Sequence, residues 1–189
     1  KPLPYRDPAR LVGLFESTPL GARFHLSYPD YLDWRRDTRA FSALDAYEPH
    51  AFRLGSPDGA SQIDGVRISA AFLRTLGVTP VLGRDFREGE DLPGAAAVAL
   101  LTHGMWQARF GGREDVLGRT LLLDDKPHTI IGVLPRAFHF APAGPAEVWT
   151  SLQPRHPDDR GSHDLSGLAR LKDGVTPQAA AADLTAVAA

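Results

Sequence analysis

The sequence predicts an α+β fold in which the two chain ends form a porter-like α/β subdomain around an inserted β-rich subdomain. Two observations lead to this prediction. A strand-like segment followed by a capped helix occurs near each end of the chain. Between them, short apolar segments alternate with Gly, Pro and Asp, a pattern typical of short strands joined by turns. We place the first subdomain at residues 1–46 and 164–189, and the insertion at residues 47–163.

Composition sets the limits of the interpretation. The chain has 189 residues, 43% of them hydrophobic, with a net charge of -2, so it can build a core and has no general attraction to nucleic acid or anionic lipid. The absence of cysteine excludes disulfides, thiolate catalysis and Cys-based zinc sites. The longest apolar run, residues 95–101, is far shorter than the roughly 20 residues of a membrane helix. The chain begins at Lys1 and ends within a helical pattern, so we expect a soluble piece of a longer protein, truncated at its C-terminal end.

The first strand-helix unit follows a Pro-rich start. Residues 11–16 are expected to form a buried strand. Ser27 is a good helix N-cap, Pro29 suits the first turn, and Asp30 completes an S-x-x-D capping pattern. We expect this helix to end near Thr38.

The middle of the chain is expected to hold short strands and helices. Val66 and Ile68 point to the face opposite Arg67, which is typical of a half-buried strand. The expected elements are an extended segment over 41–54 broken near Pro49, a turn at 56–59, a strand over 62–69, a helix over 70–76, a strand over 96–101, a helix over 103–110 capped by Thr102, a hairpin of 119–123 and 128–134 with its turn at 124–127, and a strand over 147–152.

The C-terminal part repeats the strand-helix pattern. Residues 153–163 are polar and are expected to form a linker. A strand follows over 165–171, with Arg170 on its exposed side. Thr176 caps an Ala-rich helix that begins at Pro177 and continues to the end of the chain.

No stretch of the sequence carries an activated catalytic group. Residues 112–120 faintly resemble a phosphate loop, but the glycine spacing is one residue too long and Arg119 stands where Lys is needed. A strand, not a helix, is expected to follow, so the aligned N–H donors for phosphate would be missing. There is no G-x-S-x-G motif. Seven histidines are present and none pairs as H-x-x-x-H. We therefore assign no catalytic, cofactor-binding or metal-binding residue and expect no enzyme.

Two other classes of function stay open. A small hydrolase or metal enzyme would use His103, His163 and Asp164 if folding brought them together in a pocket. A free-standing periplasmic ligand-binding module would need a pocket of aromatic side chains with a few polar groups. Contacts with a partner protein would use exposed loops, for which the candidates are 87–94, 142–145 and 154–161.

Several segments, taken together and in order, resemble the periplasmic core domain of MacB-type ABC transporter permeases, including the MacB/FtsX-type, duplicated-permease group. The resemblance covers nearly the whole chain. The segments are SYPDYLDW at 27–34 with Phe41, ISAAFLRTLG at 68–77, LGRDF at 82–86 with Glu90 and Asp91, VALLTHGMW at 98–106, RFGG at 109–112, VLG at 116–118, IIGVLP at 130–135, VW at 148–149 and ARLKDGVTP at 169–177.

This resemblance implies a non-catalytic domain on the periplasmic side of the bacterial inner membrane, held between membrane helices of a permease. It implies mechanotransmission, in which a cytoplasmic ATPase subunit or domain drives motion that the outer domain passes on for efflux or for regulation of a partner. The implied partners are that ATPase, a second permease copy and a periplasmic protein, with no nucleic acid and no cofactor. The isolated domain is expected to be a monomer, because membrane helices would supply much of the dimer contact.

Overall fold

A computed structural model describes residues 5–18 and 21–188 of the chain. The chain divides into two compact units. Unit 1 comprises the residues up to Tyr47 together with those from Pro154 onward, and unit 2 comprises Glu48–Gln153. Helices and strands are mixed in both, so the predicted α+β class is confirmed. Residues 154–163, which we expected in the insertion, group with unit 1.

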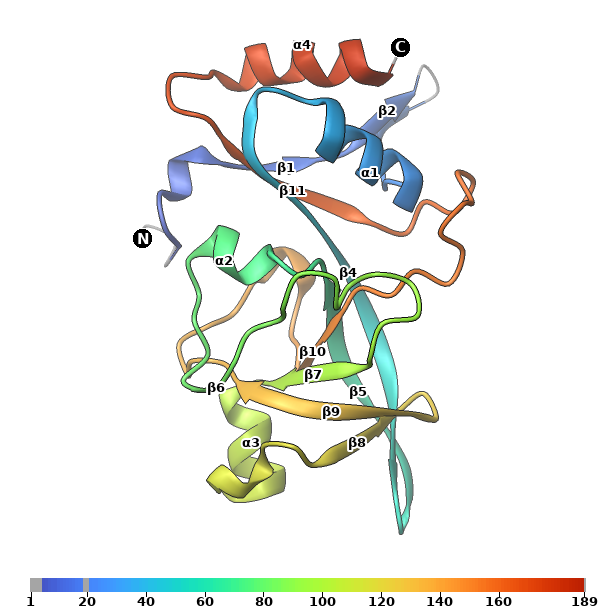
Figure 1. Cartoon of the computed structure of the whole chain (residues 1–189), viewed down its shortest axis with the longest axis vertical. Coiled ribbons are helices and arrows are strands. Elements are labelled where there is room, and N and C mark those ends of the chain that lie inside the picture. Colours follow the sequence, from blue (N-terminus) through green and yellow to red (C-terminus); the bar gives the residue numbers. More distant parts are fainter. Residues whose placement is uncertain (1–4, 19–20, 189) are drawn as a thin grey trace. The chain divides into compact units, whose positions relative to one another are not determined.

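Unit 1 contains a small antiparallel sheet with two helices (Figure 1). Strand β11 (Ser166–Leu171) lies between β1 (Leu11–Leu14) and the first part of β4 (Phe41–Ser56). In the chain, helix α1 (Tyr28–Asp37) directly precedes β4, and in the sheet β1 and β4 are separated by β11. A separate hairpin of β2 (Glu16–Thr18) and β3 (Gly21–Phe24) follows β1, and the short helix η1 (Pro8–Arg10) precedes it.

The helices of unit 1 begin at the residues that the capping pattern indicated. The Ser27 hydroxyl accepts a hydrogen bond from the Asp30 N–H at 3.2 Å at the start of α1. The Thr176 hydroxyl accepts one from the Ala179 N–H at 3.2 Å, and α4 (Pro177–Ala188) starts there. Tyr31 and Trp34 of α1 are buried, whereas Ala180 is the one buried residue of α4 in the described part of that helix.

A single carboxylate fastens α4 to the segment that follows α1. The Asp183 side chain accepts hydrogen bonds from two consecutive backbone groups, the Arg39 N–H at 2.7 Å and the Ala40 N–H at 2.8 Å. Since the small side chains of α4 bury little apolar area, this polar contact contributes a large share of its attachment.

Replacing Asp183 with alanine is expected to loosen α4, because two backbone N–H groups lose their acceptor. We expect a loss of about 1–2 kcal/mol in the free energy of unfolding, and faster amide hydrogen exchange in α4. The matched control is Thr185→Ala, which removes a methyl group and a hydroxyl whose hydrogen bond, to the Ala181 carbonyl, lies within the helix. Equal exchange rates in α4 of the Asp183 variant and the wild type would contradict this role.

Unit 2 is a small closed β-barrel with helices outside it (Figure 1). The strands pair in the order β4, β5 (Gly59–Ile68), β10 (Val148–Ser151), β7 (Val98–Leu101) and β9 (Lys126–Val133). Strand β8 (Thr120–Leu123) then pairs with both β9 and the end of β4, where Leu54 lies opposite Leu123, and this closes the ring. Closure removes the open strand edges of a flat sheet.

The remaining elements of unit 2 lie around the barrel. They are α2 (Phe72–Leu76), β6 (Leu82–Gly83), α3 (His103–Phe110), η2 (Glu114–Val116) and η3 (Ala141–Ala143). Thr102 caps α3 as expected, with its hydroxyl 3.2 Å from the Met105 nitrogen. The two-residue strand β6 pairs with the last residues of β9, on the edge opposite β7.

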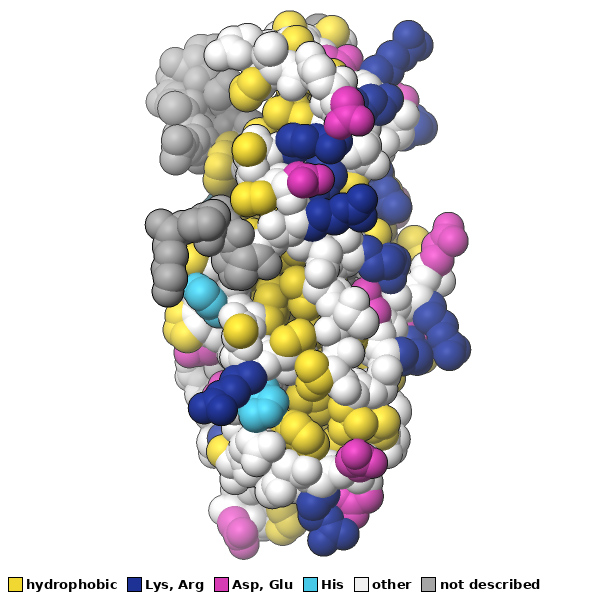
Figure 2. Space-filling model, turned by 90° about the vertical axis from the view of Figure 1, so that its left-hand side faces the viewer, with side chains coloured by type: hydrophobic (Ala, Val, Ile, Leu, Met, Phe, Trp, Pro, Cys, Tyr) yellow, Lys and Arg dark blue, Asp and Glu magenta, His cyan; other side chains and the backbone are white. Residues whose placement is uncertain are grey.

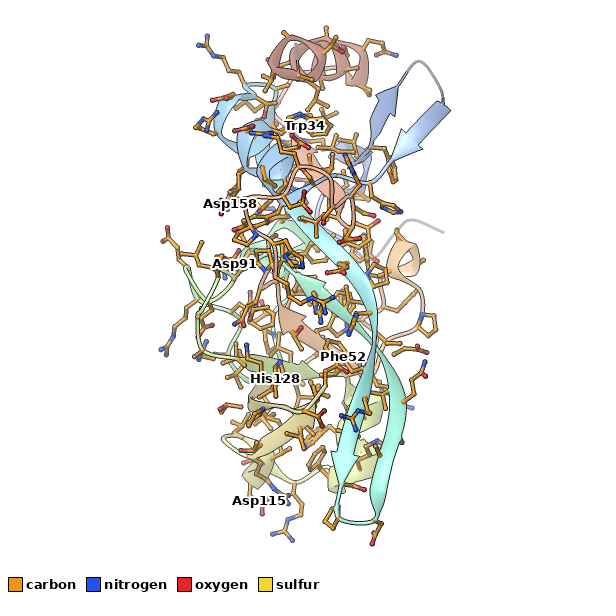
Figure 3. The ribbon with its side chains drawn as sticks, turned by 90° about the vertical axis from the view of Figure 1, so that its right-hand side faces the viewer. Trp34, Phe52, Asp91, Asp115, His128 and Asp158 are labelled. Carbon is orange, nitrogen blue, oxygen red and sulfur yellow. The ribbon has the colours of Figure 1, made fainter. Side chains whose placement is uncertain are left out.

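Two apolar clusters stabilise unit 2. The first includes Phe52, Leu101, Ile130 and Val148 and draws on strands all around the ring. The second forms around Trp149, whose ring centroid lies 5.3 Å from Phe138 and 6.2 Å from Phe72. Neighbours on a strand point to opposite faces, so Val148 and Trp149 belong to different clusters. Figure 3 labels Phe52 beside the long hairpin of β4 and β5.

Two local predictions were wrong. The chain is not broken near Pro49, because β4 runs without interruption from Phe41 to Ser56. Pro49 lies just past Tyr47, the last residue of β4 paired with β11, so its missing N–H breaks no hydrogen bond on that side. The turn of the second hairpin is also tighter than predicted: it consists of Asp124 and Asp125 alone, both with positive φ (51° and 62°), and Pro127 lies within β9.

No helix in the described part of the chain is both long enough and apolar enough to cross a membrane.

Candidate functional site

The structure does not assemble the catalytic alternative within either unit. His103 begins α3 in unit 2, where its ring packs edge-on against Trp106 at 5.5 Å. His163 and Asp164 precede β11 in unit 1, and His163 Nδ1 lies 3.1 Å from the Gly161 carbonyl oxygen. Across residues 5–18 and 21–188, no group of three or more His, Cys, Asp or Glu is placed to hold a metal ion.

The glycine-containing segment 112–120 uses its N–H groups internally. The Gly118 N–H donates to the Ile130 carbonyl at 2.8 Å, and the Arg119 N–H donates to the Val116 carbonyl at 3.1 Å. Strand β8 follows directly. These two donors are therefore used within the fold and are not arranged around an anion.

The first candidate partner loop, 87–94, is held in place by its acidic side chains. Glu90 accepts two hydrogen bonds from the Arg84 guanidinium, at 2.8 and 3.0 Å, and one from the Arg87 N–H at 2.8 Å. Asp91 accepts one from the Ala70 N–H at 2.8 Å. Partial burial raises the pKa of Glu90, but the bonds from Arg84 and Arg87 outweigh it and the pKa is lowered. Most of the loop is exposed, as expected, while Glu90 and Asp91 fix its shape and Leu92 lies exposed at its surface.

The other two loops differ from each other. Residues 142–145 include part of η3, where Ala143 is buried. In residues 154–161, which we expected to be a linker, the Arg160 guanidinium binds Asp30 and Asp33 of α1, the second at 2.7 Å. This contact explains why the segment groups with unit 1.

Two arginines tie the N-terminal segment of unit 1 to the end of β11. Arg10 donates from Nε and Nη2 to the Leu171 carbonyl, at 3.0 and 2.7 Å, and its Nη1 lies 2.8 Å from Asp173. Arg170 donates to the Arg6 carbonyl at 2.7 Å and to the Asp7 carbonyl at 3.2 Å.

The prediction that Arg170 is exposed was wrong. Its side chain is buried, and burial lowers its pKa. The alternation of the strand correctly separated Arg170 from its apolar neighbours. However, the N-terminal segment, some 160 residues earlier in the sequence, covers that side of the strand and supplies the carbonyl acceptors.

A charged cluster on unit 2 joins the long hairpin to the Asp124–Asp125 turn. His50 Nε2 lies 2.7 Å from Asp124 Oδ2, and Asp124 Oδ1 accepts the Arg53 N–H at 2.8 Å. Arg67 lies 3.5 Å from Glu48 and 3.9 Å from Asp124. Partial burial raises the pKa of Asp124, but the Arg53 N–H, His50 and Arg67 outweigh it and hold the pKa below its usual value.

Acid should remove the stabilisation that Asp124 gives. A carboxylate with a lowered pKa in the folded state stabilises above its unfolded pKa of about 3.9, and this contribution is lost as pH falls through the lower folded value. We expect Asp124→Asn to lower the free energy of unfolding at pH 7 by about 1 kcal/mol or less. The difference should shrink below about pH 4, measured as urea midpoints of both proteins between pH 7 and 2. A difference that does not change with pH would contradict this assignment.

Exposed apolar side chains also gather on unit 2, beside β6. The Leu117 side chain covers Gly83, and Val81, two residues before Gly83 in the same extended segment, is 59% exposed. Figure 2 shows hydrophobic side chains on the face of unit 2 that is turned toward the viewer. No local sequence pattern predicts this surface, because it depends on contact between Leu117, after η2, and a strand more than thirty residues earlier.

Comparison with known proteins identifies the family. The family model described as the MacB-like periplasmic core domain matches residues 4–187. Among curated proteins, none matches the chain.

Solved structures share the fold at low sequence identity. The periplasmic region of MacB from Actinobacillus actinomycetemcomitans is 16% identical, with a TM-score of 0.71 over 95% of this chain and 82% of that chain. A domain of a protein named as a permease from Porphyromonas gingivalis is 16% identical, with a TM-score of 0.63 over 86% and 70%. The extracellular domain of the noncanonic ABC-type transporter YknZ from Gram-positive bacteria is 13% identical, with a TM-score of 0.61 over 90% and 86%. Since the family model spans nearly every residue, the chain belongs to the MacB-like periplasmic core domain family.

Proposed function

We propose that this chain is a non-catalytic extracytoplasmic domain of an ABC transporter permease, and that it transmits motion driven by ATP hydrolysis in the cytoplasm. It would lie on the periplasmic side of the bacterial inner membrane and serve export or the regulation of a partner protein. The observation that carries this proposal is the family match over residues 4–187.

The construction of each unit supports a mechanical role. The arginine ties in unit 1 join the N-terminal segment to the turn before α4, so a displacement of that segment would pass into the sheet. In unit 2 the closed ring resists deformation, since each strand of the ring is paired on both sides and cannot move far without breaking hydrogen bonds to a neighbour. We propose that unit 1 is the porter-like subdomain and unit 2 the inserted one.

The proposed partners follow from the same role. An ABC ATPase would act through the membrane part of the permease, a second permease copy would lie opposite, and a periplasmic protein would contact the loops. The isolated chain would be a monomer.

These 189 residues contain no cysteine, so one cysteine introduced among them can carry a spin label, with any cysteine elsewhere in the permease replaced by serine. The full-length permease with Arg87→Cys, labelled and reconstituted with its ATPase, would be studied by pulsed electron paramagnetic resonance. We expect the distribution of distances between the two labelled copies to change when ATP is added. The control is the same complex with an ATPase that binds ATP but cannot hydrolyse it. In this control the distance between the labels should not return to the distribution found before ATP was added.

Two results would overturn the proposal. One is a distance distribution that ATP leaves unaltered in a complex that hydrolyses ATP. The other is hydrolysis of ATP or of an ester by the purified chain alone.

A further inference from the structure

Unit 1 contains a hollow of about 540 Å³ between α1, α4 and the end of β1. This volume is within the range of small-ligand pockets in proteins. Its apolar lining includes Trp34 of α1, Leu184 and Val187 of α4, and Phe15. Figure 3 labels Trp34 on α1, close to α4.

The composition of α4 explains the hollow. Where a helix packed on another usually carries Leu, Ile or Phe, this helix has a run of alanines, and a methyl group cannot fill the space above Trp34. Ala181 lines the hollow and is exposed, and Leu184 and Val187 are only partly buried. The space is therefore a consequence of the sequence of α4.

The mouth of the hollow carries a pair of carboxylates with an arginine bound to them. Asp30 and Asp33 are one helical turn apart on α1, and Arg160 binds both through its two terminal nitrogens. The hydrogen bond from Arg160 lowers the pKa of Asp33, so this carboxylate is charged. The carboxylate side chains are 22% and 30% exposed, whereas that of Arg160 is 59% exposed. The two carboxylates therefore lie largely covered on α1, whereas the Arg160 side chain that binds them is more exposed to solvent.

We propose that this hollow docks a partner protein through a basic side chain next to an aliphatic one, and that Arg160 occupies the carboxylate pair until the partner arrives. The proposal rests on the partner coupling included in the proposed function. Charge complementarity selects the basic group: two carboxylates one turn apart match the fork of a guanidinium, and Arg36, whose Nη2 lies 3.0 Å from Asp33, offsets only part of their charge. The aliphatic neighbour would cover Trp34, Leu184 and Val187.

Exchange of one guanidinium for another is energetically feasible at this position. Ion pairs in contact with water contribute little net free energy, so replacing Arg160 by a partner's arginine costs little. Burial of the partner's aliphatic side chain in the hollow would then favour the exchange.

The test uses this chain and the peptide acetyl-Leu-Arg-Leu-amide, with acetyl-Leu-Gln-Leu-amide as the uncharged comparison. Binding would be followed by the NMR signal of the Trp34 indole. We expect the arginine peptide to bind about two- to fivefold more tightly than the glutamine peptide, since an exposed ion pair contributes only a modest preference and the glutamine peptide cannot form one. The double variant Asp30→Asn, Asp33→Asn should remove this preference.

Arg160→Gln is the decisive variant, because removal of a bound competitor raises apparent affinity. We expect the arginine peptide to bind about threefold or more tightly to it. Arg155→Gln, a change in the same segment at a residue that does not line the hollow, should leave affinity unaltered. Ala181→Leu places a larger side chain in the hollow and leaves the carboxylates intact, so it should weaken binding even if the asparagine variant folds poorly.

Three results would overturn the docking site. They are equal binding of both peptides, unaltered binding to Ala181→Leu, and weaker or equal binding to Arg160→Gln, which would assign Arg160 a structural role only. Binding of octylguanidinium without binding of the peptide would also overturn it, in favour of a small amphipathic cation. These binding measurements need no ATPase or membrane. The peptide can therefore fail to bind while the ATP-dependent motion is observed, and it can bind while no such motion is observed.

Discussion

Trp149→Ala is expected to lower the free energy of unfolding by about 3–5 kcal/mol. Trp149 is 2% exposed and lies at the centre of the second apolar cluster of unit 2, between Phe72 and Phe138. Its strand pairs on both sides, with Val66 of β5 and Leu100 of β7 opposite it, so the surrounding backbone cannot move inward to fill the space. A domain of this size has only about 5–15 kcal/mol of net stability, so the loss is a large part of the total.

Urea denaturation followed by far-ultraviolet circular dichroism would measure this effect without using tryptophan fluorescence. The control is Val81→Ala, an apolar truncation at a residue that is 59% exposed, for which we expect a change within about 0.5 kcal/mol. If both variants lost the same small amount, Trp149 would not be the anchor that its packing indicates.

Gly83→Ala is expected to cost at least about 2 kcal/mol, for two separable reasons. The residue has φ +73°, a conformation that side chains with a Cβ disfavour, and an added Cβ would lie 2.1 Å from the Ile131 carbonyl oxygen. The Ile131 oxygen belongs to the backbone of β9, so relief of this collision requires β6 to move away from β9. We therefore expect faster amide exchange at Arg84, whose N–H donates to that same carbonyl.

Two other glycines distinguish the cost of backbone strain from the cost of a steric collision of the added Cβ. Gly118 has φ +82° but open space around it, so Gly118→Ala should cost only the conformational term of about 1–2 kcal/mol. Gly104 lies within α3, has no positive φ and also faces open space, so Gly104→Ala should stabilise by about 0.5–1 kcal/mol. The ranking of the three variants by thermal unfolding tests the argument, and a Gly83 variant as stable as the Gly118 variant would refute it.

Local signals in the sequence predicted the helices well. Ser27, Thr102 and Thr176 each cap the helix that they were expected to cap, because capping depends on side chains within three residues of the N–H groups that they satisfy. The hairpin of β4 and β5 was also predicted, since turn chemistry and strand alternation are both local.

Contacts between distant residues could not be predicted. The barrel closes where Leu54 meets Leu123, and neither residue carries a sign of its partner. Arg170 was misjudged for the same reason, since alternation gives the side of the strand but not what covers it. Within the candidate docking site, Asp30 was predicted only as part of a helix cap, because its contact with Arg160 spans 130 residues of sequence.

The chain enters and leaves unit 2 at neighbouring positions, which bears on whether unit 2 can fold as a separate module. The polypeptide enters unit 2 at Glu48 and leaves it at Gln153. Glu48 forms an ion pair with Arg67 at 3.5 Å, and Ser151 lies opposite Ile68, the next residue, so both crossings are at the same end of the ring. An insert whose two ends nearly meet can be excised or transplanted without stretching its host. Residues 48–153 expressed alone should fold autonomously, and a short Gly-Ser bridge between Tyr47 and Pro154 should replace them in what remains.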